Sequence, residues 1–218
     1  MCFSATASFI AGTALSGLGV ATLRATRRRS EILFAAIPLI FGLQQMVEGA
    51  LWLSFRVDAP LLNLAMTYLF SMFSHVLWPI FVPFAIGLPE TVPWRRMVIR
   101  GFQGVGLLVG LYLLFLIVEF PVTAVAAENI VYVSPHFYKI PVMLLYLAAT
   151  CVSCFFSSNA TIRLFGALAL LLFGVAYGFF AVALFSVWCF FAALLSAIIF
   201  VHFKFGRRIP VRWLGSAA

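Results

Sequence analysis

Residues 32–54 read ILFAAIPLIFGLQQMVEGALWLS, a long apolar run that contains two neighbouring amides and one carboxylate. About 20 consecutive apolar residues suffice for a helix to cross the hydrocarbon core of a bilayer, so the run predicts a membrane-spanning helix. A carboxylate near the middle of such a helix costs about 2.5–3.5 kcal/mol on insertion scales. Glu48 therefore needs a compensating partner or a functional reason to be there.

The composition of the whole chain extends this interpretation. Of its 218 residues, 65% are hydrophobic and only 9% are charged, with 25 phenylalanines. A soluble domain carries about 25% charged residues. We therefore expect this chain to be surrounded by the lipid bilayer, which is its first predicted partner. The net charge of +8 would suggest a nucleic-acid partner in a soluble protein. Here the basic residues stand at the ends of apolar runs, which is typical of membrane topology, and we expect no nucleic-acid binding.

Seven apolar runs are long enough to span: residues 5–23, 32–54, 61–88, 101–118, 139–157, 163–181 and 184–203. We therefore expect an all-α, polytopic membrane protein, a seven-transmembrane-helix bundle forming one integral membrane domain over residues 1–218. The sixth and seventh runs are barely separated near residues 180–183. Six spans with one long hairpin is the alternative.

The arginines and lysines predict the orientation. Twelve of the fourteen lie in one set of connections, around residues 24–29, 95–100, 163 and 204–212, whereas only Arg56 and Lys139 lie in the other. Because cytoplasmic loops are enriched in Lys and Arg, the N-terminus is expected outside and the C-terminus inside. Both ends fit this rule only if the number of spans is odd, which favours seven.

Small residues and the longest connection give further expectations. The first run is rich in Gly, Ala and Ser, which lets a helix pack closely against its neighbours in lipid. Gly104, Gly106 and Gly110 resemble part of a nucleotide loop, but no strand precedes them, so packing is the expected role. The segment 119–138 is the longest outer connection and is expected to cap the bundle.

The polar face of residues 32–54 is the first candidate site. Gln44, Glu48 and Trp52 are spaced four residues apart and Gln45 precedes Glu48 by three, so all four fall on or beside one helix face. Glu48 is expected in the outer third of the membrane. The face either forms a buried hydrogen-bond network that fixes helix packing, or binds a ligand, proton or metal with Glu48 as a catalytic group.

The second candidate is Ser74-His75-Val76-Leu77-Trp78-Pro79 in the next run. His75 follows Ser71 by four residues. Pro79 cannot donate to the carbonyl of His75, so a kink is expected at this point. The open backbone and the imidazole suit a cavity, a water or an ion, with His75 as a second catalytic group and Ser71 and Trp78 as ligand contacts. A histidine that only holds helices together is the alternative.

Outer cysteines and a histidine suggest a metal. Cys2, Glu48, His75, His136 and Cys189 offer sulfur, oxygen and nitrogen ligands that would suit zinc or copper if the fold brought them together. Ser186 and Cys189 share one helix face. Ser186 and Trp188 are further expected contacts of the ligand. Cys151 and Cys154 form a C-x-x-C inside an apolar run, where buried small side chains are the better interpretation.

The opening Met1-Cys2-Phe3-Ser4-Ala5 resembles that of an uncharacterised family of bacterial multi-pass membrane proteins. Gln44-Gln45 with Glu48-Gly49 and Trp52, Trp78-Pro79, and the stretch Ser186 to Ala193 are similar to its other signatures. The resemblance implies a protein of the bacterial inner membrane and supplies no activity.

Three functions are therefore carried forward. The leading hypothesis is a polar, outward-facing intramembrane pocket that binds a small ligand or metal ion, including the case of a membrane-embedded metalloenzyme. The second is a small-solute or proton-coupled transporter that uses Glu48 and His75. The third is a structural or assembly subunit whose polar residues only pack.

Overall fold

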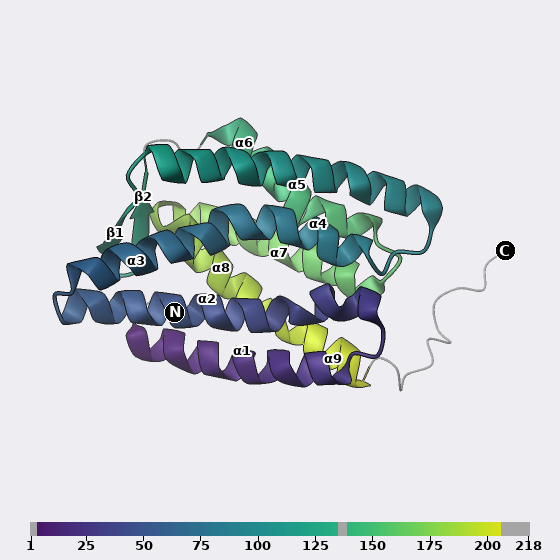
Figure 1. The fold of residues 1–218 in the computed structure, drawn as a ribbon, viewed down its shortest axis with the longest axis horizontal. Coiled ribbons are helices and arrows are strands. Elements are labelled where there is room, and N and C mark those ends of the chain that lie inside the picture. Colours follow the sequence, from purple (N-terminus) through teal and green to yellow (C-terminus); the bar gives the residue numbers. More distant parts are fainter. Residues whose placement is uncertain (1–3, 135–138, 206–218) are drawn as a thin grey trace.

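The computed structural model describes residues 4–134 and 139–205, which form a bundle of helices with one β-hairpin (Figure 1). The helices are α1 (Ala5–Ala25), α2 (Ile32–Arg56), α3 (Pro60–Ser71), α4 (Trp78–Gly87), α5 (Pro93–Glu119), α6 (Ile140–Thr150), α7 (Ala160–Phe179), α8 (Leu184–Leu195) and α9 (Ala197–Phe205). A π-helical turn, Met72–Leu77, joins α3 to α4. Shorter 3₁₀ turns are Arg29–Glu31, Val152–Phe156 and Ala181–Ala183. The strands are β1 (Thr123–Ala126) and β2 (Ile130–Val133).

Six helical segments are long and apolar enough to cross a membrane: Ala5–Ala25, Arg29–Arg56, Pro60–Gly87, Pro93–Glu119, Ala160–Phe179 and Ala181–Phe205. The helical architecture that the sequence predicts, with several long apolar helices, is thus confirmed. The run expected at 139–157 is the shorter apolar segment Ile140–Phe156. The run expected at 101–118 begins earlier, at Pro93, because proline favours the first turn of a helix and the arginines after it continue the helix.

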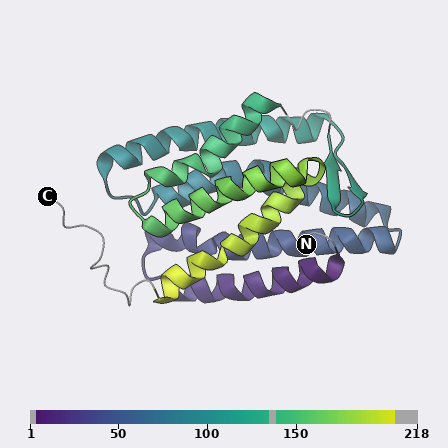
Figure 2. The same ribbon diagram turned by 180° about the vertical axis from the view of Figure 1, so that it is seen from behind.

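The doubtful boundary between the sixth and seventh runs is a tight turn. α7 ends at Phe179 and α8 begins at Leu184, with Ala181–Ala183 between them. The two helices fold back on each other and the α8–α9 segment continues across the bundle (Figure 2). The indole of Trp188 on α8 donates to the carbonyl of Ala169 on α7 at 2.9 Å. Ala160–Phe179 and Ala181–Phe205 are therefore two separate apolar segments, each long enough to span a membrane.

Glycines allow two close helix contacts. α1 packs along α2, where a Cβ at Gly12 would meet the carbonyl oxygen of Gly42 at 3.0 Å. α5 packs on the kinked α4, where a Cβ at Gly106 would overlap the carbonyl oxygen of Pro79. The expected packing role is therefore confirmed for Gly12 and Gly106, whereas a Cβ at Gly17 or Gly104 would meet nothing within 4 Å.

The connection between α5 and α6 contains a β-hairpin, which the all-α expectation missed. β1 and β2 pair antiparallel, with Ala126 opposite Ile130. Ile130 and Tyr132 are buried among Trp52, Phe70 and Cys189, and the ring of Tyr132 stacks on Phe70 with centroids 4.4 Å apart. The strands are short and follow a proline, so no long alternating pattern announces them. As expected, the segment caps one end of the bundle.

The two ends of the bundle differ. The hairpin and the α2–α3 turn lie at one end, whereas the α1–α2 and α4–α5 connections and the end of α9 lie at the other (Figure 1). The arginine-rich connections are therefore gathered opposite the hairpin. We call these the basic end and the hairpin end.

Candidate functional site

The polar face of α2 lies inside the bundle. Gln44, Gln45 and Glu48 are all 0% exposed. The amide of Gln45 donates to Oε2 of Glu48 at 3.4 Å, and the hydroxyl of Ser186 on α8 donates to Oε1 at 2.5 Å. The structure thus brings together Glu48 and Ser186, which are 138 residues apart.

Gln44 connects this face to α4. The indole N–H of Trp78 donates to Oε1 of Gln44 at 2.7 Å, and the ring of Trp78 stacks on Phe41 with centroids 3.9 Å apart. The amide of Gln44 also lies against the thiol of Cys189 on α8. Gln44 therefore lies where α2, α4 and α8 meet.

His75 lies in the π-helical turn, at the kink that Pro79 predicts, and is 1% exposed. The hydroxyl of Ser74 lies 2.7 Å from its Nδ1, and the backbone carbonyl of Ser74 accepts a hydrogen bond from Tyr146 on α6. The ring of Phe185 packs on the imidazole with centroids 4.2 Å apart. Single π turns inside helices are frequent at functional sites.

His75 and Glu48 contact consecutive residues of α8. Phe185 packs on the imidazole and Ser186 donates to the carboxylate. One turn of α8 thus holds both of the ionisable groups predicted as catalytic. We refer to Gln44, Gln45, Glu48, His75 and Ser186 as the Glu48 cluster.

The other predicted contacts lie around this cluster. Trp52 is buried beside Cys189 and under Tyr132 of the hairpin, at the hairpin end of the Glu48 cluster. Ser71 donates to the carbonyl of Thr67 in its own helix at 2.8 Å and so contributes to helix geometry. Trp188 points away from the cluster, toward α7.

Buried polar atoms on the same face of α2 as Glu48 have no hydrogen-bond partner within the described residues. Oε1 of Gln45 is an acceptor and Nε1 of Trp52 is a donor, whereas Nε2 of Gln44, also without such a partner, lies against the thiol of Cys189. A buried polar group without a partner costs about 1–3 kcal/mol, so most such groups in proteins are satisfied by the chain, water or a ligand. Oε1 of Gln45 and Nε1 of Trp52 both lack the hydrogen bond that buried polar groups in proteins normally have.

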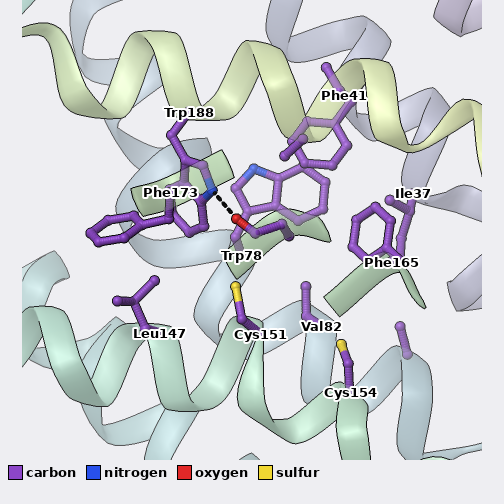
Figure 3. Close-up of a cluster of buried hydrophobic side chains, with 14 of the residues drawn as sticks. Ile37, Phe41, Trp78, Val82, Leu147, Cys151, Cys154, Phe165, Phe173 and Trp188 are labelled. Atoms are coloured by element: carbon purple, nitrogen blue, oxygen red, sulfur yellow. Dashed lines mark hydrogen bonds between the residues drawn. The ribbon is translucent and has the colours of Figure 1, made fainter. Parts of the chain in front are cut away.

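A small cavity lies next to the cluster, between Trp78, Trp188, Tyr146, Cys151 and Cys189. Figure 3 shows three of these side chains, Trp78, Trp188 and Cys151, in the apolar core. Its volume is about 30 Å³, and its walls are mostly aromatic and apolar. This is room for about two water molecules. Glu48 and His75 do not line it. Cys151 and Cys154 are buried in the same core, as expected.

The metal expectation finds no support in the part of the chain that the structure describes. No group of three or more His, Cys, Asp or Glu side chains there is arranged to hold a metal ion. Glu48 lies close enough to the thiol of Cys189 to interact with it, but the two belong to no such group. Cys2 and His136, the two remaining expected ligands, lie outside the described residues.

Sequence reasoning missed Tyr146 and Phe185. Tyr146 is the one tyrosine deep in residues 139–157, and a buried hydroxyl in an apolar run is the signal that could have found it. Phe185 carries no such signal among 25 phenylalanines. At the hairpin end, Trp52 and Cys189 are buried together with Ile130 and Tyr132 of the hairpin. The expected outward opening of the pocket stays a prediction.

A second polar centre, not predicted, lies at the basic end. Glu90, 2% exposed, joins the α4–α5 connection to the α6–α7 connection. One carboxylate oxygen accepts from the backbone N–H of Ser158 at 2.6 Å, and the other from the Ser158 hydroxyl and the N–H groups of Thr91 and Val92. Burial alone would raise the pKa of Glu90, but these hydrogen bonds outweigh it and lower the pKa below its usual value.

Comparison with known proteins adds a family and no activity. The model of a family described as "Family of unknown function (DUF6629)" matches residues 1–213. The resemblance to an uncharacterised family is therefore confirmed. No curated protein matches the chain, and no solved structure does.

Proposed function

We propose, from the premise that the chain belongs to this family of unknown function (DUF6629), that it is an integral membrane protein whose Glu48 cluster binds a small polar ligand. The observation that carries the proposal is the pair of unpartnered atoms, Gln45 Oε1 and Trp52 Nε1, beside a fully buried carboxylate. A ligand with one donor and one acceptor would satisfy both.

The energetics support a ligand over mere packing. A buried carboxylate and two unsatisfied polar groups together cost several kcal/mol, which a purely structural network could avoid with apolar side chains of similar size. Ser186 and Gln45 already occupy positions on both oxygens of Glu48. If the ligand is a substrate, Glu48 and His75 would serve as its acid and base. Both contact the same turn of α8.

A metal ion is the second form of the same proposal. Zinc or copper would require Cys2 and His136 to join Glu48, His75 and Cys189, since the three described residues alone form no metal group. Metal analysis of the purified protein distinguishes the two forms, with Cys2→Ala as the variant that removes the best sulfur ligand.

The membrane arrangement is proposed with the site. Seven spans require Ile140–Phe156 to cross, and its helical and 3₁₀ parts together extend on the order of 26 Å, close to the thickness of the hydrocarbon core. The gathering of arginines opposite the hairpin supports an N-terminus outside and a C-terminus inside. The bacterial inner membrane is the proposed location.

A transporter is the alternative that one observation favours. The π turn at His75, followed by Pro79 and Pro83, is a place where the Pro60–Gly87 segment can bend. Against transport stands the basic half of the bundle, where Phe34, Ile99 and Phe203 belong to a continuous apolar core. These residues favour a site that is closed at the basic end over a polar path that crosses the whole membrane.

The deciding experiment measures what the purified protein retains. We expect wild-type protein in mild detergent to release a small molecule or metal on denaturation, detected by mass spectrometry and elemental analysis. Glu48→Gln and Trp52→Phe are expected to lower the retained amount at least about tenfold, the loss of a charged or buried hydrogen bond. Glu128→Gln, an exposed carboxylate, and Trp94→Phe, an indole that is 53% exposed, serve as matched controls.

The structural-subunit hypothesis predicts a different outcome. If nothing is retained by any preparation, and Glu48→Gln changes only the melting temperature, the Glu48 cluster is a packing element. That result would overturn the proposal.

A further inference from the structure

A second polar groove lies at the hairpin end, outside the Glu48 cluster. It is bounded by the end of α2, the α2–α3 turn, the first turns of α3 and strand β1, and its volume is about 360 Å³. The side chains that matter for its chemistry are Ser54, Phe55, Asp58, Asn63, Thr67 and Thr123. Small-molecule sites in proteins begin at about 300 Å³, so the groove has the size of a binding site.

The groove offers acceptors. Asp58 is exposed and makes no ion pair or hydrogen bond with any described residue. Asn63 donates from its amide nitrogen to the hydroxyl of Ser54 at 3.0 Å, which leaves its carbonyl oxygen available. A carboxylate and an amide oxygen accept hydrogen bonds, so they favour a ligand rich in N–H donors.

One side chain in the groove is buried and unsatisfied. Thr67 is 1% exposed, and its hydroxyl has no hydrogen-bond partner within the described residues. A threonine inside a helix normally bonds to the carbonyl one turn earlier, and this one does not. The ring of Phe55 forms part of the wall and suits a cation over its face.

We propose that this groove binds a small primary ammonium compound, such as an amino alcohol, with the ammonium at Asp58 and Asn63 and a hydroxyl at Thr67. The inference goes beyond the proposed function, because the groove and the Glu48 cluster share no residue. What distinguishes the groove is that an exposed carboxylate, Asp58, lines the same hollow as a buried hydroxyl without a partner, that of Thr67.

The test titrates three matched probes into the purified full-length protein in nanodiscs by calorimetry. Ethanolamine carries the ammonium and the hydroxyl, ethylene glycol lacks the charge, and glycolate reverses it. Saturable binding is expected for ethanolamine alone. Asp58→Asn is expected to weaken it about tenfold, because a hydrogen bond to a charged group is lost, and Glu128→Gln is expected to leave it unchanged.

Thr67→Val gives a signature that a purely structural threonine would not give. Removing an unsatisfied hydroxyl is expected to raise the melting temperature of the free protein, while ethanolamine binds about threefold more weakly or worse. Binding of the three probes with equal affinity, or an Asp58→Asn variant that binds like wild type, overturns the inference. Glu48→Gln leaves groove binding intact, so failure here is distinguishable from failure of the proposed function.

Discussion

Glu90 defines how one residue holds the basic end together. Four hydrogen bonds converge on its carboxylate, three of them from backbone N–H groups in two separate connections. Its backbone carbonyl in turn accepts from Arg96 at 2.8 Å. A single buried side chain thus links the ends of α4, α5 and α7. It accepts from backbone N–H groups that lie outside the helices.

The charge of Glu90 predicts a pH dependence. Because the folded pKa lies below the unfolded value of about 4.3, the stabilisation is complete above that value and is lost as the pH falls through the lowered folded pKa. We expect the melting temperature of wild type to drop below about pH 4 more steeply than that of Glu90→Gln. At neutral pH, Glu90→Gln is expected to be less stable by about 1 kcal/mol.

The check is thermal unfolding in detergent from pH 3 to pH 7. Glu128→Gln is the control, because Glu128 is exposed in the turn of the hairpin. Parallel curves for wild type and Glu90→Gln at all pH values would contradict the assignment.

At the same scale, sequence spacing predicted part of the Glu48 cluster. Gln44, Gln45 and Glu48 share a helix face because helical geometry is local, and they are buried together. The partner Ser186 was named as a ligand contact, but its bond to Glu48 depends on how α2 and α8 pack, which spacing does not encode. The groove at Asp58 was missed because none of its residues is unusual in the sequence, and they come together only when α2, α3 and β1 pack.

Between elements, glycine positions decide how closely helices approach. Gly106 on α5 faces the carbonyl oxygen of Pro79 and has no side chain to push it away. That carbonyl receives no backbone hydrogen bond from residue 83, because Pro83 has no N–H. Gly104, two residues earlier, has nothing within 4 Å of a built Cβ. The same helix therefore contains a critical glycine and a neutral one.

We expect Gly106→Ala to destabilise the protein by about 1–3 kcal/mol, the usual cost of overpacking. Gly104→Ala is expected to be neutral, or stabilising by up to about 1 kcal/mol through helix propensity. Melting temperatures of the two variants in the same detergent give the comparison. Equal effects would mean that α4 and α5 do not pack as described.

Hydropathy predicted the elements because lipid demands long apolar helices. It failed at the hairpin, since Thr123–Ala126 and Ile130–Val133 are too short for a periodic signal and are stabilised by burial of Ile130 and Tyr132 against α2, α3 and α8. It also overestimated the regularity of residues 139–157, where helix gives way to a 3₁₀ turn after Thr150.

For the whole molecule, the arrangement in the membrane is open to a direct test. In a Cys2→Ser background, Glu128→Cys and Ala160→Cys flank the Ile140–Phe156 segment at exposed positions. We expect an impermeant maleimide to label Glu128→Cys in intact cells, and Ala160→Cys only after the cells are opened, because the positive-inside rule places the hairpin outside.

Arg27→Cys, in the α1–α2 connection, is the matched control for the inner side. Labelling of both Glu128→Cys and Ala160→Cys from outside would show that Ile140–Phe156 does not cross. The number of spans would then be six, with the two termini on the same side.

The π turn at Met72–Leu77 determines how α4 is rotated about the helix axis relative to α3. One residue added to an α-helix turns everything after it by about 100°, so the half that begins at Trp78 is out of step with the half that ends at Ser71. The first half presents Phe70 to the hairpin, and the second presents Trp78 to α2. The number of residues in this turn therefore sets which side chains of α4 face α2 when Phe70 of α3 faces the hairpin. Deleting one residue of the turn would rotate α4 relative to α3 about the helix axis, with almost no change in the composition of the segment.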